Sequence, residues 1–221
     1  MSVRVSKDKV IEMPIIAAEE EASGLLHVIV TESHYAAVVN DPARKLFKTR
    51  FLGTQILQQW SDLQLWDTVF EANTGTKLFL ELGTGWGAMS MFFLMECIQI
   101  GAKFVTVDQH NAVLAAGSQL ARRLDLYSHF WQGDMWGDLR YKIDALIDDP
   151  ANHPMILFCD GGNKPKEMQT FGPMLKPGDI IAHHDFGGEI DYTSTDGLPL
   201  RKIFLEESEA TYARTRWFER V

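Results

Sequence analysis

The chain has 221 residues, and 46% of them are apolar, a fraction typical of a globular protein and too high for wholesale disorder. Twenty-one lysine and arginine residues against 30 aspartate and glutamate residues give a formal net charge of −9. A surface this acidic repels phosphate backbones and anionic lipids, so we expect neither a nucleic acid partner nor a membrane partner.

Cysteine usage and the start of the chain point to the cytoplasm. Cys97 and Cys159 each lie in an apolar run, which predicts buried thiols rather than a disulfide framework. Residues 1–10 mix charges with apolar residues and do not have the continuous apolar core of a signal peptide. We therefore expect a cytoplasmic protein.

Residues 1–76 show no regular alternation of strands and helices, and we interpret them as an N-terminal helical cap of the same domain. Apolar residues at intervals of three or four, from Ile56 through Trp60 and Trp66 to Phe70, predict one face of an amphipathic helix. Tryptophans at this spacing are typical of a core, although they could also line a site.

Residues 77–221 alternate between strand and helix patterns and form the predicted core. The predicted strands are 77–82, 103–107, 128–132, 155–159, 179–182 and 211–221. The predicted helices cover the residues from the glycine turn to 98, and then 112–124, 139–147, 167–175 and 200–210. This alternation predicts an α/β fold, Rossmann-like and doubly wound, with a mostly parallel sheet and helices on both faces. Ligands of such sheets bind beyond the carboxyl ends of the strands.

A glycine-rich turn follows the first predicted strand of the core and opens a helix. It contains Glu81, Gly83, Thr84, Gly85 and Gly87. Glycines let the backbone approach a ligand closely, and the helix N-terminus offers unpaired N–H donors. The pattern also fits a dinucleotide-binding turn or a purely structural one. A carboxylate directly before the glycines would repel a pyrophosphate, however, and suits a cationic or amine-bearing ligand.

Acidic residues also follow the next two predicted strands. Asp108, with Gln109 beside it, ends the second strand, where a carboxylate can accept hydrogen bonds from both hydroxyls of a ribose. The alternative for Asp108 is a helix N-cap. Gly133 and Asp134 end the third strand, within reach of an adenine amino group, although Asp134 could equally be a solvated loop acid.

These motifs, in this order, resemble those of the class I S-adenosylmethionine-dependent methyltransferases. The turn Leu175–Asp179, before the fifth strand, resembles a further motif of that family, so the resemblance extends from residue 76 to about residue 186. It implies S-adenosylmethionine as the cofactor, with Glu81 and the glycine turn at its methionine end. A narrower likeness links residues 60–66, 160–164 and 173–178 to the cephalosporin-hydroxylase-like branch, which is close to the cation-dependent O-methyltransferases.

Acidic and histidine residues follow the fourth and fifth predicted strands. Asp160, His184 and Asp185 could converge on one divalent cation; oxygen ligands suit Mg²⁺, and an imidazole favours Mn²⁺, Fe²⁺ or Zn²⁺. In the resembled families such residues hold a cation that orients a substrate hydroxyl. The resemblance also makes Lys164 the candidate general base, with His183 in reserve. The alternative is that Asp160 contacts only the cofactor and that the histidines are an ordinary polar strand end.

The preferred hypothesis is methyl transfer, most simply O-methylation, to a small hydroxylated molecule with the help of Mg²⁺ or Mn²⁺. An NAD-dependent oxidoreductase and a non-catalytic cofactor-binding module are the alternatives. The resembled fold commonly ends in two antiparallel strands, whereas only one strand is predicted after the last helix. We therefore expect that the hairpin is incomplete or that a partner subunit of a homo-oligomer completes it.

Overall fold

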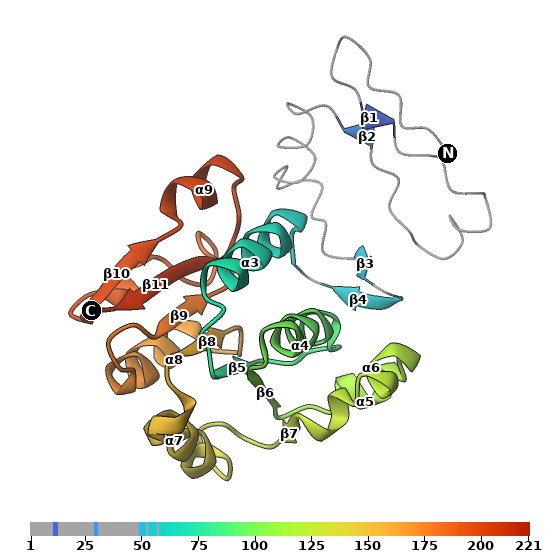
Figure 1. Cartoon of the computed structure of the whole chain (residues 1–221), viewed down its shortest axis with the longest axis horizontal. Coiled ribbons are helices and arrows are strands. Elements are labelled where there is room, and N and C mark those ends of the chain that lie inside the picture. Colours follow the sequence, from blue (N-terminus) through green and yellow to red (C-terminus); the bar gives the residue numbers. More distant parts are fainter. Residues whose placement is uncertain (1–10, 13–28, 31–48, 52, 57) are drawn as a thin grey trace.

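The computed structural model describes residues 11–12, 29–30, 49–51, 53–56 and 58–221. Most of the predicted cap, residues 1–76, lies outside these residues, so the division of the chain at residue 76 stays a prediction. In the described part before residue 60 there are two short antiparallel pairs (Figure 1). These pairs are β1 (Ile11–Glu12) with β2 (Ile29–Val30), and β3 (Thr49–Phe51) with β4 (Thr54–Ile56).

A seven-stranded sheet forms the centre of the described part. In spatial order its strands are β10 (Leu200–Ile203), β11 (Arg216–Arg220), β9 (Ile180–His183), β8 (Met155–Cys159), β5 (Leu78–Leu82), β6 (Lys103–Asp108) and β7 (Phe130–Gln132). The five strands from β9 to β7 are parallel, and β11 runs antiparallel to both of its neighbours. The first strand, β5, lies between β6 and β8, so the direction of winding reverses there and creates a switch point for ligands.

The residues of the central strands explain their position. Every residue of β5 and of β8 is buried, as expected of parallel strands that are covered on both faces. In register, Leu80 of β5 pairs with Val105 on one side and Leu157 on the other. The carboxyl ends of these strands therefore meet at one edge of the sheet, where the predicted site residues follow.

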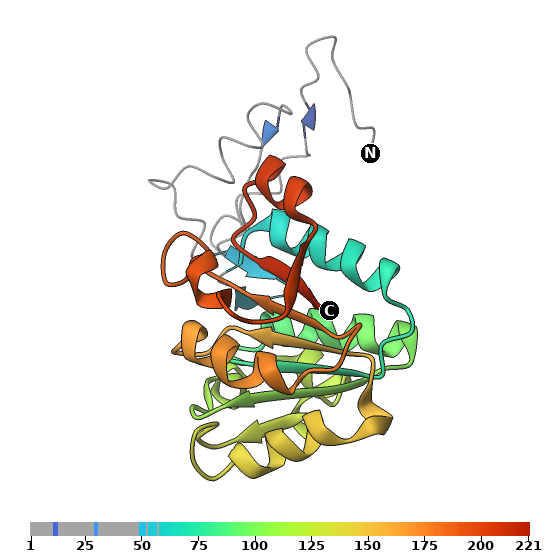
Figure 2. The same ribbon diagram turned by 90° about the vertical axis from the view of Figure 1, so that its left-hand side faces the viewer.

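Helices cover both faces of the sheet (Figure 2). One face carries α3 (Trp60–Ala72), α4 (Ala88–Ile100), α5 (Ala112–Ala116) and α6 (Gln119–Arg123), and the other carries α7 (Arg140–Asp148) and α8 (Lys164–Phe171). The short helix α9 (Leu205–Ala210) lies between β10 and β11 in the chain. This arrangement confirms the predicted Rossmann-like, mostly parallel fold with helices on both faces. No helix in the described part of the chain is long and apolar enough to cross a membrane.

Aromatic side chains dominate the core between α3, α4 and the sheet. Trp66 is fully buried, and its ring makes edge contacts with Phe93, Phe158 and Trp217 at centroid distances of 5.0, 5.1 and 5.2 Å. Edge-to-face pairs at this spacing add to the free energy gained from burying the rings. Trp66 is thus a core residue rather than part of the site, and Cys97 and Cys159 are buried free thiols, as predicted.

Three predicted helices have different bounds in the structure. Ile56 belongs to β4, and α3 begins only at Trp60, where the Asp62 side chain accepts from the Gln59 N–H at 3.2 Å. The predicted helix 112–124 is broken into α5 and α6 at Gly117, which has a φ of +62°. The helix predicted over 167–175 begins earlier, because the Asn163 side chain caps α8 by accepting from the Lys166 N–H.

The helix predicted over 200–210 is present only in its second half, as α9. The expectation of an incomplete hairpin is wrong. Leu200–Ile203 forms strand β10, which pairs with β11 from Leu200 opposite Arg220 to Ile203 opposite Trp217. Apolar residues three apart, as in Leu200 and Ile203, fit a helix as well as a short edge strand, and only the open edge of β11 decides between them. The chain completes its own antiparallel end, and the predicted homo-oligomer stays a prediction.

Candidate functional site

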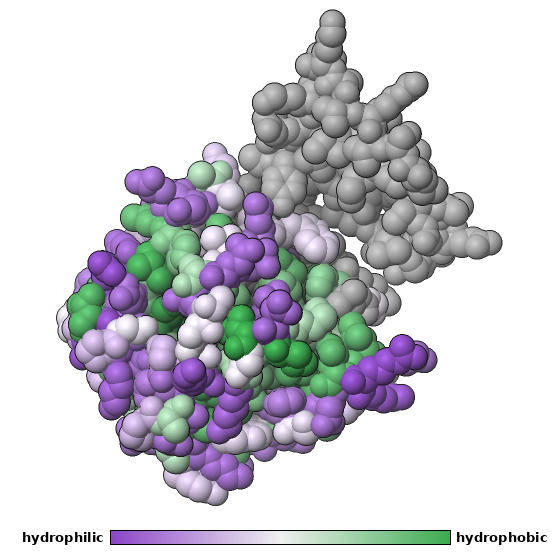
Figure 3. Space-filling view, in the orientation of Figure 1, coloured by the Kyte–Doolittle hydropathy of each residue, from purple (hydrophilic) through white to green (hydrophobic). Residues whose placement is uncertain are grey.

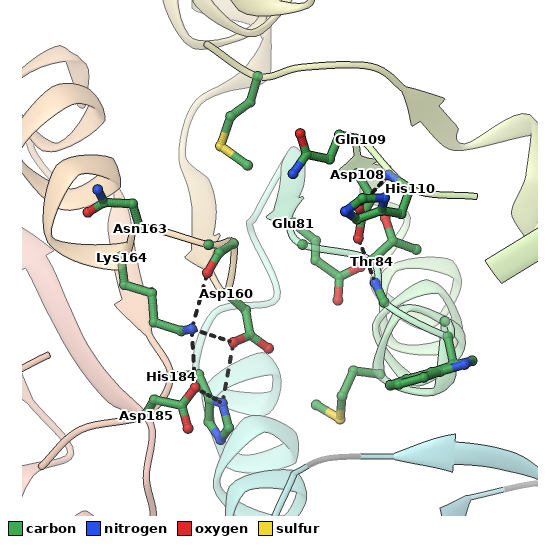
Figure 4. A pocket seen from close by; sticks show the side chains of 18 of the residues that line it. Glu81, Thr84, Asp108, Gln109, His110, Asp160, Asn163, Lys164, His184 and Asp185 are labelled. Carbon is green, nitrogen blue, oxygen red and sulfur yellow. Dashed lines mark hydrogen bonds and ion pairs between the residues drawn. The ribbon is translucent and has the colours of Figure 1, made fainter. Parts of the chain in front are cut away.

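A cleft of about 650 Å³ opens at the carboxyl ends of strands β5 to β9. All of the predicted site residues except His183 line it. Figure 4 shows one group of side chains around Asp160 and Lys164, and a second group around Thr84 and Asp108, with Glu81 between the two. The face in Figure 3 carries hydrophilic side chains spread over the described surface rather than gathered in one region. The cleft and the chemistry of the side chains that line it, rather than surface hydropathy, therefore distinguish the site from the rest of this face (Figure 3).

Two glycines of the turn after β5 have distinct roles. A Cβ on Gly83 would lie 2.2 Å from the carbonyl oxygen of Asp160, so only glycine allows the turns after β5 and β8 to approach this closely. A Cβ on Gly85 would meet nothing within 4 Å, and its φ is +54°. Gly83 therefore packs the two turns together, whereas Gly85 leaves open space beside the cleft for a ligand.

Glu81 is a buried carboxyl group beneath the cleft. Its Oε2 accepts hydrogen bonds from Ser90 Oγ at 2.5 Å and from Thr106 Oγ1 at 2.6 Å, and Thr84 Oγ1 lies 2.6 Å from Thr106 Oγ1. Burial raises the pKa of Glu81 to about 8, although the two hydroxyl hydrogen bonds oppose the rise. A cationic ligand group nearby would favour the charged carboxylate, so Glu81 can respond to the charge of what binds above it.

The Asp108 carboxylate is held at the end of β6 by two backbone N–H groups. Its Oδ2 accepts from Gly85 at 2.9 Å, and its Oδ1 accepts from His110 at 2.8 Å. The N-cap of α5 is Asn111, so Asp108 does not have the capping role that was its alternative. The carboxylate bridges the glycine turn and the β6 turn and keeps oxygen lone pairs for a ligand, with Gln109 beside it (Figure 4).

Gly133 and Asp134 shape the turn after β7. Asp134 Oδ1 accepts from the Trp136 N–H at 2.9 Å, and the Asp134 N–H donates to Asp138 Oδ1 at 2.8 Å. A Cβ on Gly133 would lie 2.6 Å from Asp138 Oδ2. The two residues line the cleft, but much of their hydrogen bonding is used within their own turn.

Asp160, His184 and Asp185 come together from two adjacent strand ends. His184 Nδ1 lies 3.3 Å from Asp160 Oδ1 and 3.4 Å from Asp185 Oδ2, and the three residues offer ligand atoms within 4.8 Å of one another. Asp185 adopts a φ of +63°, a conformation that is uncommon for a residue other than glycine. Two carboxylate oxygens and one imidazole nitrogen converging in this way fit the ligand preferences of a divalent cation such as Mn²⁺ or Mg²⁺.

The protonation of His184 follows from its two carboxylate neighbours. Burial by itself would lower the pKa of His184, but Asp160 and Asp185 outweigh it and raise the pKa to about 10. The ring is therefore an imidazolium at neutral pH in this arrangement. Coordination of a cation through Nδ1 requires the loss of that proton.

The Lys164 ammonium lies in the same cluster. Its Nζ is 2.8 Å from Glu189 Oε2, 3.1 Å from Asp185 Oδ2 and 3.5 Å from Asp160 Oδ1. Burial would lower the pKa of Lys164, but the carboxylates outweigh burial and raise the pKa above its ordinary value. A general base needs a neutral amine, so this arrangement favours a different role for Lys164, and its role as the base stays a prediction.

His183 is in the core and does not line the cleft. Its ring is fully buried, with Phe186 at a centroid distance of 6.0 Å and Phe218 at 5.6 Å. Burial lowers the pKa of His183 to about 3, so the ring is neutral. Successive side chains of a strand point to opposite faces, which explains why His184 reaches the cleft and His183 does not. The structure gives no support to His183 as the reserve base.

Sequence reasoning missed four residues around the cluster. Gln58 Nε2 donates to Asp160 Oδ2 at 2.8 Å, and Arg214 Nη2 lies 3.3 Å from Asp185 Oδ1. Asp62 Oδ2 lies 3.9 Å from His184 Nε2, and Glu189 contacts Lys164 as described above. None of these residues directly follows a parallel strand, so the strand-end pattern did not mark them as site residues.

Several solved structures are similar to this one. The apo structure of CmcI-N160 has a TM-score of 0.56 and 14% identity, over 97% of this chain and 91% of its own. The structure of CmcI-N160 with SAH has a TM-score of 0.54 and 14% identity, over 87% and 94% of the two chains. The O-methyltransferase TomG from Streptomyces achromogenes, in complex with SAM, is 17% identical over 75% of this chain and 70% of its own, with a TM-score of 0.44.

This chain spans 59% of the length of a Staphylococcus aureus protein that is provisionally assigned as a caffeoyl-CoA O-methyltransferase. The match is 15% identical, covers 59% of this chain and has a TM-score of 0.45. No protein-family model and no curated protein matches the sequence. At these identities the two CmcI-N160 matches show the fold alone, in agreement with the predicted Rossmann-like fold.

Proposed function

We propose that this protein is an S-adenosylmethionine-dependent methyltransferase that acts on a hydroxyl group of a small molecule. One observation carries the proposal. A single cleft joins a glycine turn and two strand-end acids, Asp108 and Asp134, to the convergent donor set of Asp160, His184 and Asp185. The first part suits a nucleoside cofactor, and the second suits the activation of an acceptor oxygen beside it.

In this proposal the cofactor lies along the ends of β5, β6 and β7. Glu81 and the glycine turn, with Thr84, Gly85 and Gly87, hold its methionine end; Asp108 and Gln109 hold the ribose; Gly133 and Asp134 border the adenine; and Asp160 lies near the reacting centre. S-adenosylmethionine supplies an electrophilic methyl group on a sulfonium. The residues of the chain align the acceptor oxygen with that methyl group, which is the main requirement of an in-line displacement.

The charges of the cleft favour this cofactor over a dinucleotide. Carboxyl groups of Glu81, Asp108, Asp134 and Asp160 all line the cleft. An acid at the position of Asp108 also binds the ribose in dinucleotide folds, so the distinction rests on Glu81 and Asp160 beside the glycine turn, where a dinucleotide fold offers N–H groups to the pyrophosphate. A sulfonium and an α-amino group, in contrast, are cations that carboxylates attract.

Asp160, His184 and Asp185 would hold a divalent cation at the acceptor end. The cation would lower the pKa of a bound hydroxyl and orient its oxygen. Deprotonation of the acceptor hydroxyl would then need neither Lys164 nor His183 as a general base. Lys164 would have to be a neutral amine for that role, and the His183 ring is buried in the core. Gln58, which donates to Asp160, would keep that carboxylate oriented.

Calorimetry with S-adenosylhomocysteine, and separately with NAD, tests the proposal. We expect binding of S-adenosylhomocysteine and none of NAD. Methyl transfer to a panel of phenols, catechols and aliphatic alcohols, with Mn²⁺ or Mg²⁺ present, would then be measured as the release of S-adenosylhomocysteine. Binding of NAD alone would favour the oxidoreductase alternative, and cofactor binding without transfer to any acceptor would favour a non-catalytic module.

A further inference from the structure

The buried ammonium of Lys164 contacts the same carboxylate oxygens that would bind the divalent cation. Asp160 Oδ1 and Asp185 Oδ2 lie 3.5 and 3.1 Å from Nζ, and 3.3 and 3.4 Å from His184 Nδ1. The ammonium thus compensates the repulsion between two neighbouring carboxylates. A divalent cation seated among the three donor atoms would lie next to the Lys164 ammonium, and like charges at such a separation repel in a largely buried cluster.

The third carboxylate partner of Lys164 lies outside the donor set. Glu189 Oε2 accepts from Nζ at 2.8 Å, the shortest of the three carboxylate contacts, and its side chain is 61% exposed. Nζ also donates to the Gly161 carbonyl oxygen at 3.1 Å. These two acceptors would remain for the ammonium when Asp160 and Asp185 turn to a cation.

We propose that Lys164 is a built-in counter-ion, which an incoming divalent cation displaces from Asp160 and Asp185, and that Glu189 receives the displaced ammonium. Lys164 keeps the two carboxylates in place before the cation binds, and it weakens the binding of that cation. Glu189 lowers the free-energy cost of displacing the ammonium. This inference rests on the cation site of the proposed function and gives that site a tuned, moderate affinity.

Other charged groups face the same cluster from neighbouring elements. Arg214 Nη2 lies 3.3 Å from Asp185 Oδ1, the other oxygen of that carboxylate, and His184 must give up a proton if it becomes a ligand. Asp62 faces the far side of His184, 3.9 Å from Nε2. Lys164 with Glu189 is a pair that can move its positive charge from the donor set to a carboxylate outside it.

Titration of Mn²⁺ at a fixed pH, followed by electron paramagnetic resonance of the free ion, tests the proposal in the full chain. We expect Lys164→Met to lower the Kd at least about tenfold, because it removes a cation beside the site. Glu189→Gln should raise the Kd about two- to fivefold, the scale of a partly exposed ion pair. In the Lys164→Met background, Glu189→Gln should have no further effect, because its influence is exerted through the ammonium.

Two controls separate this mechanism from a general change of charge. Glu209→Gln, an exposed residue of α9, should leave the Kd unchanged. Lys164→Arg, which keeps the positive charge, should stay close to wild type. If Lys164→Met does not fold, as judged by its melting curve, the Glu189→Gln and Lys164→Arg titrations decide the question.

Three outcomes would overturn the proposal. The first is an unchanged or higher Kd in a folded Lys164→Met variant, and the second is a Glu189→Gln effect of equal size with and without Lys164. The third is absence of Mn²⁺ binding in both wild type and Lys164→Met. Calorimetry with S-adenosylhomocysteine distinguishes these failures from a failure of the proposed function, because the cofactor residues lie at the other end of the cleft.

Discussion

At the residue scale, the structure turns a set of strand-end acids into groups with different electrostatic roles. Glu81 is buried among hydroxyl donors, Asp108 is held by backbone N–H groups, and Asp160 shares its charge with Lys164 and His184. Carboxylates look alike in a sequence, but their partners determine whether each one is neutral, oriented for hydrogen bonds, or paired with a cation.

Removal of the Asp108 carboxylate should weaken cofactor binding. We expect Asp108→Ala to reduce the affinity for S-adenosylhomocysteine by about 1.5–3 kcal/mol, the scale of hydrogen bonds to a charged group. Calorimetry measures the loss, and Asp148→Ala, on the exposed end of α7, serves as the matched control. An unchanged affinity in Asp108→Ala would show that this carboxylate does not bind the ribose.

The raised pKa of Glu81 predicts a pH dependence of stability. Its pKa rises from 4.5 to about 8 on folding, so the folded protein holds this proton more tightly than the unfolded chain. The resulting stability is fully present below about pH 4.5 and is lost as the pH rises towards 8, at about 1.4 kcal/mol per pH unit. Glu81→Gln has no such proton to lose.

Urea denaturation at pH 5 and at pH 8 measures this effect without ligand. The free energy of unfolding of wild type should fall relative to that of Glu81→Gln by several kcal/mol between the two pH values. Parallel behaviour of the two proteins over this range would mean that Glu81 is already ionised in the folded state.

At the element scale, the turns after β5 and β8 form one packed unit. Gly83 N–H donates to the Val107 carbonyl oxygen, and Asp160 N–H donates to the Leu82 carbonyl oxygen, both at 2.8 Å. These bonds extend the sheet ladder past the strand ends. The position of Asp160 in the cleft therefore depends on the backbone of the glycine turn as well as on its own strand.

A methyl group on Gly83 should destabilise this unit far more than one on Gly85. Gly83→Ala would place a Cβ 2.2 Å from a backbone oxygen at a φ of +106°, and we expect a loss of more than about 3 kcal/mol in unfolding free energy. Gly85→Ala meets no neighbour and should cost only about 1 kcal/mol for its left-handed backbone. Equal losses in thermal or urea denaturation would contradict this assignment.

At the scale of the whole molecule, the proposed cation links elements that are distant in the chain. The donor residues follow β8 and β9, and Gln58 and Asp62 bring the segment that enters α3 against them. Asp62 also accepts from the Thr215 N–H at 2.8 Å, which ties the start of α3 to the segment before β11. A ligand at this point should therefore stabilise the global fold and not only one loop.

We expect millimolar Mn²⁺ to raise the melting temperature of wild type, because the unfolded chain cannot gather the three ligands. Asp185→Asn, which keeps the size of the side chain, should abolish the rise. The rise should also shrink as the pH falls, because His184 and the carboxylates must be deprotonated to bind. Calorimetric scans with Mn²⁺ and with EDTA measure this, and identical scans would argue against a cation site.

The sequence by itself determined the alternation of strands and helices and the mostly parallel sheet. It also pointed to residues that line the cleft, with His183 as the exception. The reason is geometric: a parallel sheet brings the carboxyl ends of its strands to one edge, so a residue just past a buried strand can be assigned to that edge. Glu81, Asp108, Asp160 and His184, which lie at or just past the ends of four of these strands, all line the cleft.

Only the tertiary structure decided which neighbours these residues have. Gln58 reaches Asp160 across 102 positions of the chain, and Glu189 reaches Lys164 from a loop without any strand-end signal. The same holds for β10, which becomes a strand because β11 offers it an open edge. Burial and long-range charge pairing set the pKa of Glu81 and of Lys164, and both depend on contacts that no local pattern of residues records.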